Sequence, residues 1–200
     1  MIALVLTERR SDLTRQRAEN YAQLHERLAA ASTEPVAVSH YEEVDLDRLT
    51  RSTSIVLSGS SAPWAAHDPA ALDRLGAALI ESRRPVLGIC AGMQLLARFS
   101  GGTVAASAAP ERGFLPVRVL DASDLLDGLP GEVRVFQDHE DEVTALPPGF
   151  RVLAESDACA VQAIADPARR WWGTQFHPEE ATSEHPAGER VLRTFFSLAG

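Results

Sequence analysis

The chain has 200 residues, 45% of them hydrophobic, and carries a formal net charge of −9 at pH 7. This size and apolar content fit one globular domain over residues 1–200. The acidic balance disfavours nucleic-acid binding, which needs clustered basic residues. No apolar run approaches the roughly 18 residues of a membrane span, and no signal peptide is evident. With only two cysteines, no disulfide framework is expected, and we expect a cytoplasmic protein that binds neither nucleic acid nor membranes.

Strands and helices alternate in the first half of the chain. Apolar runs predict strands at 2–6, 35–39, 55–57 and 86–89, and amphipathic patterns predict helices at 13–31 and 72–82. In the helix at 13–31, Leu24 and Leu28 share one face. This βαβ order predicts an α/β fold, with an open, mainly parallel twisted sheet and helices on both faces.

The middle of the chain, residues 113–165, has a different character. Short apolar runs bounded by Pro- and Gly-bearing turns predict strands at 117–120, 133–136, 151–154 and 160–165. We expect these few strands to pair antiparallel at one side of the sheet. A further short strand at 171–176 follows, and a closing helix at 188–198 should turn Val191, Leu192, Phe195 and Phe196 inward.

Cys90 lies in a segment, residues 86–94, that reads VLGICAGMQ. An apolar strand enters a Gly-x-Cys-x-Gly turn and helix-forming residues leave it, which is the pattern of a nucleophile elbow. The strained turn requires small neighbours, and Gly88 and Gly92 supply them. The dipole of the following helix favours the thiolate form. A buried structural cysteine before a helix is the alternative interpretation.

His177 and Glu179 are the candidates for the base and for the group that orients it. Both follow the predicted strand at 171–176, and Pro178 ends that strand by removing a ladder donor. Two residues apart in an extended segment, they can lie on one side and share a hydrogen bond. A cysteine nucleophile needs a base of this kind. The alternative is a surface histidine near an acid.

Together, these motifs resemble those of the class I (triad) glutamine amidotransferases. Residues 88–94 (GICAGMQ) and 173–179 (GTQFHPE) resemble the family's two signature motifs. Residues 55–59 (IVLSG) and 138–150 (DHEDEVTALPPGF) are similar to stretches in the amidotransferase domain of GMP synthetases. The resemblance extends from residue 1 to about 196 and implies the family's flavodoxin-like fold. Among the members of the family, the chain is closest to that domain of GMP synthetases.

The resemblance implies a glutaminase mechanism without cofactor or metal. Cys90 would attack the side-chain amide of L-glutamine and form a γ-glutamyl thioester, with His177 as the base and Glu179 orienting it. The oxyanion would be bound by the backbone N–H groups of Ser60 and Ala91. The resemblance assigns further substrate contacts to Gly59, Gln94, Asp138, His139, Glu140 and Asp141.

The oxyanion loop departs from the family pattern. The family often reads Ser-Gly-Gly-Pro where this chain has Ser58, Gly59, Ser60 and Ser61. A serine forced into a glycine-only conformation would lose about 1–2 kcal/mol. The loop is therefore expected either to differ in shape or to become active when a partner binds.

Three functions fit the sequence. The preferred one is a glutaminase subunit that supplies ammonia to a separate synthetase or transferase. The second is a stand-alone hydrolase of γ-glutamyl amides with the same triad. The third is a binding or regulatory module, which the presence of all three triad residues disfavours.

Three further interpretations concern single features. The acid-rich stretch at 137–142 is either a docking edge for a basic partner protein or a solvated loop. Cys159 is interpreted as a small apolar filler. Trp64 is interpreted as an ordinary packing aromatic, with packing over the active site as the alternative. The remaining histidines show no metal-ligand spacing, and residues 59–61 lack the sequence of a phosphate loop.

Overall fold

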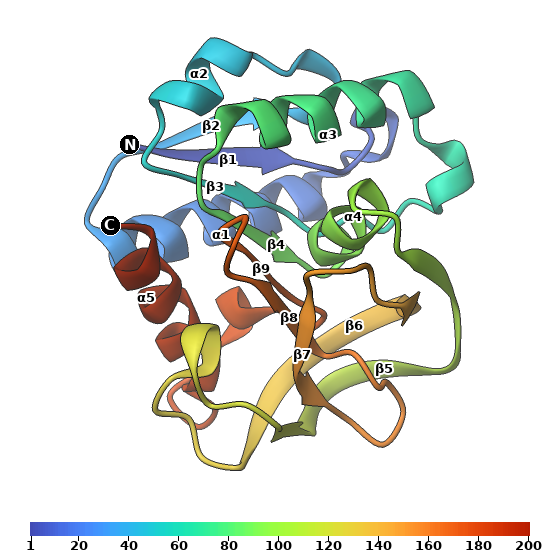
Figure 1. Cartoon of the computed structure of the whole chain (residues 1–200), viewed down its shortest axis with the longest axis vertical. Coiled ribbons are helices and arrows are strands. Elements are labelled where there is room, and N and C mark those ends of the chain that lie inside the picture. The colour runs from blue at the N-terminus through green and yellow to red at the C-terminus, as the bar shows by residue number, and fades with distance from the viewer.

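One nine-stranded sheet runs through the molecule (Figure 1), with the strand order β2-β1-β3-β4-β9-β8-β7-β5-β6. The computed structural model describes residues Met1–Gly200. The strands are β1 (Ile2–Leu6), β2 (Val36–His40), β3 (Ser54–Leu57), β4 (Val86–Ile89), β5 (Thr103–Val119), β6 (Glu132–Ala145), β7 (Arg151–Glu155), β8 (Ala163–Asp166) and β9 (Trp171–Thr174). The predicted α/β fold is confirmed.

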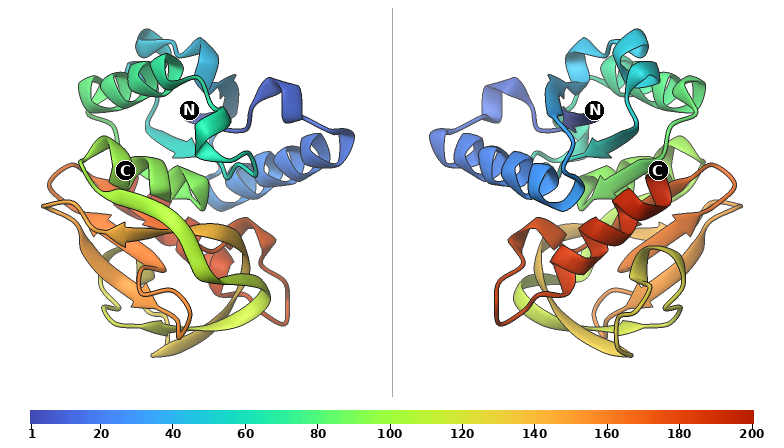
Figure 2. Two further views of the ribbon diagram at one scale, coloured as in Figure 1. Left: turned by 90° about the vertical axis from the view of Figure 1, so that its right-hand side faces the viewer. Right: turned by 90° about the vertical axis from the view of Figure 1, so that its left-hand side faces the viewer.

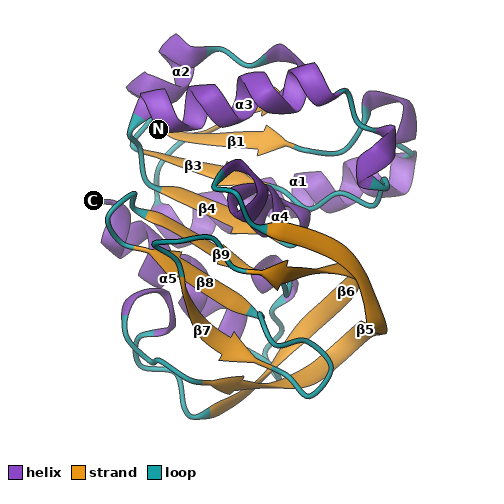
Figure 3. Cartoon of the chain, turned by 45° about the vertical axis from the view of Figure 1, so that its right-hand side comes forward, coloured by secondary structure: helices purple, strands orange, loops and turns teal.

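The sheet divides into a parallel and an antiparallel part (Figure 3). Parallel pairings join β2, β1, β3, β4 and β9. Antiparallel pairings join β9, β8, β7, β5 and β6. The antiparallel part extends further along its strands than the sequence predicted, because β5 and β6 are much longer than the apolar runs at 117–120 and 133–136.

Helices cover both faces of the parallel strands (Figure 2). They are α1 (Arg15–Ser32), α2 (Leu46–Arg51), α3 (Pro69–Ser82), α4 (Ala91–Phe99) and α5 (Ala187–Ala199). On one face, α1 contributes Leu24 and Leu28 to a buried cluster that α5 completes. On the other face, α3 and α4 contribute Leu75 and Leu95 to a second cluster. None of these helices has the combination of length and apolar character that is needed to cross a bilayer.

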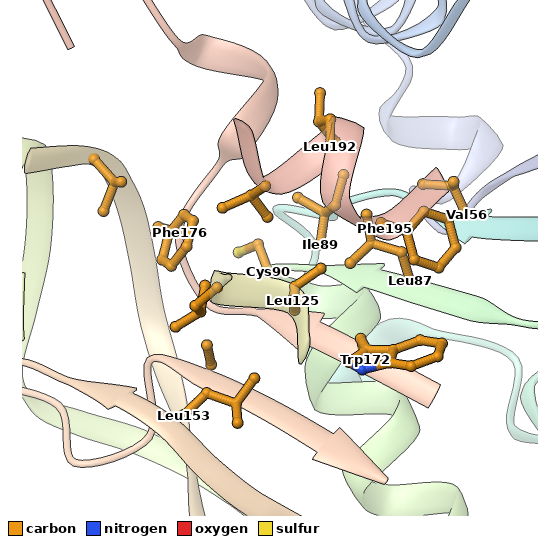
Figure 4. Packing of buried hydrophobic residues seen from close by; sticks show 14 of the residues in the cluster. Val56, Leu87, Ile89, Cys90, Leu125, Leu153, Trp172, Phe176, Leu192 and Phe195 are labelled. Carbon is orange, nitrogen blue, oxygen red and sulfur yellow. The ribbon is translucent and has the colours of Figure 1, made fainter. Parts of the chain in front are cut away.

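The closing helix α5 packs on the sheet through its apolar stripe (Figure 4). Leu192 and Phe195 lie near Ile89 of β4 and Trp172 of β9, and all four are buried. Burying a large apolar side chain stabilises a fold by about 1.5–3 kcal/mol. Because Ile89 immediately precedes Cys90, this packing also holds the end of β4 in place.

The acid-rich stretch at 137–142 is part of β6, so its interpretation as a solvated loop is wrong. Residues alternate between buried and exposed along it, with Gln137 and His139 buried and Asp138 and Glu140 exposed. The buried positions carry polar side chains, so the alternation that marks a strand is hidden in the sequence. In β5, Pro110 falls within a register shift between Ala106 and Glu111, where the ladder needs no donor.

Candidate active site

Cys90 occupies the tight turn between β4 and α4. Its backbone angles are φ 51° and ψ −110°, a conformation that non-glycine residues rarely adopt. A Cβ at Gly88 would lie 2.5 Å from the backbone of Gly92, and one at Gly92 would lie 2.6 Å from the carbonyl oxygen of Leu57. The flanking glycines are therefore required by close packing of strand, turn and helix, as predicted.

His177 is brought to Cys90 by the pairing of β4 with β9. The two strands run parallel with Ile89 opposite Thr174, and the N–H of Cys90 donates to the carbonyl of Thr174 at 2.7 Å. Parallel neighbours end at the same edge of a sheet, so the segments that follow them emerge together. The N–H of His177 then donates to the carbonyl of Phe136 on β6 at 2.8 Å.

Glu179 completes the group from the short 3-10 turn Pro178–Glu180. Its Oε1 lies 2.9 Å from Nδ1 of His177, so the carboxylate accepts the Nδ1 proton and leaves Nε2 for the nucleophile. Burial lowers the pKa of His177, but the carboxylate of Glu179 and the sulfur of Cys90 outweigh burial and raise it well above its ordinary value. A base that holds its proton beside a sulfur favours the thiolate–imidazolium pair.

The segment that follows β3 packs directly against the triad. A Cβ at Gly59 would lie 3.1 Å from Cε1 of His177 and 3.6 Å from Cβ of Cys90. Ser60 does not adopt a positive φ, so the conformational cost considered for a serine at this position does not arise. Its N–H donates to no other group, and Ala91, as the first residue of α4, has no carbonyl of its own helix to bond.

All the predicted site residues border one cavity of about 600 Å³. They are Gly59, Ser60, Cys90, Ala91, Gln94, Asp138, His139, Glu140, Asp141, His177 and Glu179. Residues that the sequence did not point to also border it, among them Glu8, Arg17, Tyr21 and Trp64. Glu8 is the second residue after β1, and its place at the carboxyl edge of the sheet was the signal that could have identified it.

Gln94 is held by three hydrogen bonds. Its Nε2 donates to the carbonyl of Asp141 at 2.9 Å and to Oε1 of Gln175 at 3.1 Å. Its Oε1 accepts from the indole of Trp64 at 3.0 Å. Both amide hydrogens are therefore committed, and one Oε1 lone pair remains for a ligand. Trp64 packs against the second buried cluster, as an ordinary aromatic would, and its indole also borders the cavity.

The backbone of β6 forms the wall opposite the elbow. The carbonyl of Asp138 lies 3.9 Å from Sγ of Cys90. The carboxylates of Asp138 and Glu140 are instead paired with Arg112 of β5, at 3.3 and 2.5 Å. Gln175, which the sequence analysis did not single out, places its Nε2 3.6 Å from the sulfur.

His139 does not offer its ring to a ligand. Its Nε2 lies 3.2 Å from Oε2 of Glu111, and its Nδ1 lies 3.1 Å from the carbonyl oxygen of Asp141. The same Oε2 accepts from Ser156 at 3.0 Å and from Gln162 at 2.6 Å. The imidazole therefore supports the cavity wall from behind.

Cys159, His139 and Glu111 form a second, buried group with the residue types of a triad, and their polar atoms lie within 4.8 Å of one another. The Cys159 thiol donates to the carbonyl of Val161 at 3.4 Å, and burial raises its pKa to about 12. A thiol that stays protonated is a poor nucleophile. Cys159 is buried as expected, but it lies beside polar groups and is not an apolar filler.

A strained cysteine whose neighbouring base is oriented by a carboxylate is typical of enzymes that cleave amides or esters through a cysteine-bound acyl intermediate. Comparison with known proteins gives the particular class. The family model described as "Glutamine amidotransferase class-I" matches residues 17–198. The chain belongs to the class I glutamine amidotransferase family, whose members use a cysteine nucleophile triad.

Several relatives carry the name GMP synthase. The chain is 44% identical over 116 residues to a glutamine-hydrolysing GMP synthase subunit of Pyrococcus furiosus, covering 58% of this chain and 61% of that protein. It is 44% identical over 150 residues to the glutamine-hydrolysing GMP synthase of Thermus thermophilus, covering 75% of this chain and 29% of that protein. The chain thus spans about three fifths of the first relative and less than a third of the second.

A solved structure shares the whole fold. It is a protein from Thermoplasma acidophilum described as a GMP synthase subunit, with a TM-score of 0.80 and 27% sequence identity. The match covers 100% of this chain and 94% of that chain. The resemblance to GMP synthase amidotransferases seen in the motifs is confirmed.

Proposed function

We propose that the chain hydrolyses the side-chain amide of L-glutamine and delivers the ammonia to a separate synthetase or transferase subunit. The observation that supports this most strongly is the convergence of Cys90, His177 and Glu179 on one cavity. The family and the names of the relatives, which describe glutamine-hydrolysing proteins, point the same way. We further propose that residues 1–200 act as one unit, because the sheet is continuous.

The proposed reaction passes through a thioester. The thiolate of Cys90 attacks the amide carbon of glutamine, and the carbonyl oxygen becomes an oxyanion. The imidazolium of His177 then protonates the leaving nitrogen, the C–N bond breaks, and ammonia departs. His177, now neutral, takes a proton from water, whose oxygen attacks the thioester. Glutamate leaves, and the thiolate–imidazolium pair is restored.

The oxyanion in this mechanism is bound by two backbone amides. One is the N–H of Ala91, at the positive end of α4, and the other is the N–H of Ser60. Both are preorganised donors, so they require no rearrangement as the charge develops. The negative φ of Ser60 removes the objection that a serine raised at this position.

The substrate's α-amino and α-carboxylate groups would contact the opposite wall. The remaining acceptor of Gln94 and the backbone carbonyl of Asp138, which lies near the sulfur, suit an ammonium group. The Asp141 carbonyl is already bonded by Gln94 and His139. Gly59 leaves space beside the imidazole, since any side chain there would meet it. The docking of a basic partner protein on the acidic stretch and the cytoplasmic location stay predictions.

Glutamate release from L-glutamine by the purified protein tests this proposal, with Cys90→Ala as the matched control. We expect turnover that the variant loses, while its circular dichroism spectrum and thermal midpoint stay close to those of the wild type. The same assay with γ-glutamyl-p-nitroanilide tests the alternative hydrolase. A retained rate in Cys90→Ala, or cleavage of the anilide without any glutamate release from glutamine, would contradict the proposal.

A further inference from the structure

The carbonyl of Gly59 lies within hydrogen-bond distance of three hydroxyl groups, those of Thr7, Tyr21 and Ser58. The Tyr21 hydroxyl, from α1, donates to it at 3.1 Å, and Oγ of Ser58 donates to it at 2.8 Å. The Ser58 hydroxyl is oriented in turn by the N–H of Thr7, which donates to its oxygen at 3.0 Å. The Thr7 hydroxyl donates to the carbonyl of Ser58 at 2.9 Å and also lies 3.1 Å from the carbonyl oxygen of Gly59. With this arrangement both lone pairs of the Gly59 carbonyl are used.

Glu8 holds the next part of the same loop. This carboxylate is 1% exposed and accepts from the N–H and the hydroxyl of Ser61, at 3.0 and 2.9 Å. It also accepts from the Ser60 hydroxyl at 3.1 Å and lies 3.3 Å from the guanidinium of Arg17. A buried carboxylate with this many donors is a rigid anchor.

These two anchors lie on either side of the peptide bond between Gly59 and Ser60. All peptide bonds in the chain are trans, so the N–H of Ser60 points away from the carbonyl that Tyr21 holds. The N–H of Ser61 is tied to Glu8 and is unavailable to a ligand. The N–H of Ser60 therefore remains as a donor whose direction is set from both sides.

We propose that Tyr21 and Glu8 are positioning residues that hold the Gly59–Ser60 peptide as an oxyanion donor. The inference rests on the proposed function in taking Cys90 as the nucleophile and the Ser60 N–H as a donor to the oxyanion. Ser60 and Ser61, which replace the family's glycine and proline, allow Glu8 to hold the loop, because their hydroxyl groups donate hydrogen bonds to its carboxylate. Neither Tyr21 nor Glu8 touches the reacting atoms.

Two reagents separate this role from a general effect on the thiol. Acylation of Cys90 by p-nitrophenyl acetate passes through an oxyanion, and the sulfur bonds to the carbonyl carbon as p-nitrophenolate leaves. Alkylation by iodoacetamide displaces iodide at a saturated carbon and develops no oxyanion. A variant that misplaces the Ser60 N–H should therefore slow the first reaction and leave the second unchanged.

Tyr21→Phe is the sharpest variant, because it removes one hydroxyl and keeps the ring. Losing an oxyanion donor outright lowers kcat by about 100- to 1000-fold, so loosening one should slow acylation by roughly tenfold. Alkylation should stay within about twofold. Tyr41→Phe is the matched control, since Tyr41 is buried and does not border the cavity, and it should change neither rate.

Glu8→Gln provides a second perturbation of the same peptide. Its amide nitrogen cannot accept from Ser61, so acylation should again fall. In combination with Tyr21→Phe the effects should be less than multiplicative, because both act on one peptide. Thermal midpoints show whether each variant is folded.

The outcomes are distinct. Unchanged acylation in Tyr21→Phe would overturn the inference, and so would an equal fall in acylation and alkylation, which indicates a damaged triad. A wild-type protein that is acylated at Cys90 but releases no glutamate from glutamine would refute the proposed function alone. Slowed acylation with intact alkylation would then still support the roles of Tyr21 and Glu8.

Discussion

Replacing Glu179 by glutamine tests whether the negative charge of this side chain raises the pKa of His177. The carboxylate is 2.9 Å from Nδ1 of His177, and its second oxygen is buried without a partner. Glutamine keeps the shape of the side chain and one hydrogen-bond acceptor. It removes the negative charge that raises the pKa of His177 against the lowering effect of burial. We expect the pKa of His177 to fall, because burial is then balanced by the sulfur of Cys90 alone.

The size of the effect follows from the hydrogen bond. A hydrogen bond to a charged group contributes about 1.5–3 kcal/mol, and each 1.4 kcal/mol is tenfold in rate. Glutamate release by Glu179→Gln should therefore fall by about 10- to 100-fold at neutral pH. Glu179→Ala should fall further, since it also loses the orientation of the ring, yet remain above His177→Ala.

The pH dependence of alkylation by iodoacetamide provides the assay, with the His177 resonances followed by NMR. The onset of Cys90 reactivity should move to higher pH in Glu179→Gln, because the imidazolium that stabilises the thiolate is weakened. An unchanged profile together with a lower glutaminase rate would refute this reasoning and leave Glu179 with an orienting role alone.

The free energy of unfolding should depend on pH through the protonation of His177. A histidine whose pKa is raised by folding stabilises the protein fully below its unfolded value of about 6.5. This contribution is lost as the pH rises through the folded pKa. The free energy of unfolding of the wild-type protein should therefore fall as the pH rises from the unfolded to the folded pKa of His177. The fall should be weaker in Glu179→Gln.

The two cysteines should differ sharply in reactivity: in the native protein one thiol, Cys90, reacts with iodoacetamide, and Cys159 reacts only after unfolding, since burial raises its pKa to about 12. Peptide mass spectrometry after alkylation with and without denaturant checks this, and fast native labelling of Cys159 would contradict it. Trp64→Phe removes the indole donor to Gln94, which should raise KM for glutamine several-fold while kcat changes less, as steady-state kinetics would show. An unchanged KM would mean that Gln94 needs no such support, and Phe99→Leu, away from the cavity lining, is a suitable control.

Much of the catalytic machinery could be predicted from the sequence because it depends on local order. The elbow needs glycines two residues before and two residues after Cys90, and these positions lie close together in the chain. The histidine and glutamate follow a strand and flank a proline, a spacing that is also local. Parallel strands end at one edge, so the meeting of these segments could be expected once the βαβ order was recognised.

The surroundings of the triad depend on contacts between distant parts of the chain. Glu8 meets Ser61 across 53 positions, and His139 meets Glu111 across 28. Such pairs have no signature in either segment alone, because each residue is an ordinary polar residue in its own neighbourhood. The part of β6 beyond residue 136 was hidden for a related reason: its buried Gln137 and His139 are polar, so hydrophobic alternation, which predicts strands, is absent there. Local spacing thus predicted the nucleophile and its base, whereas the hydrogen bonds that orient the loop and the wall around them arise when the chain folds and buries polar groups that must find partners.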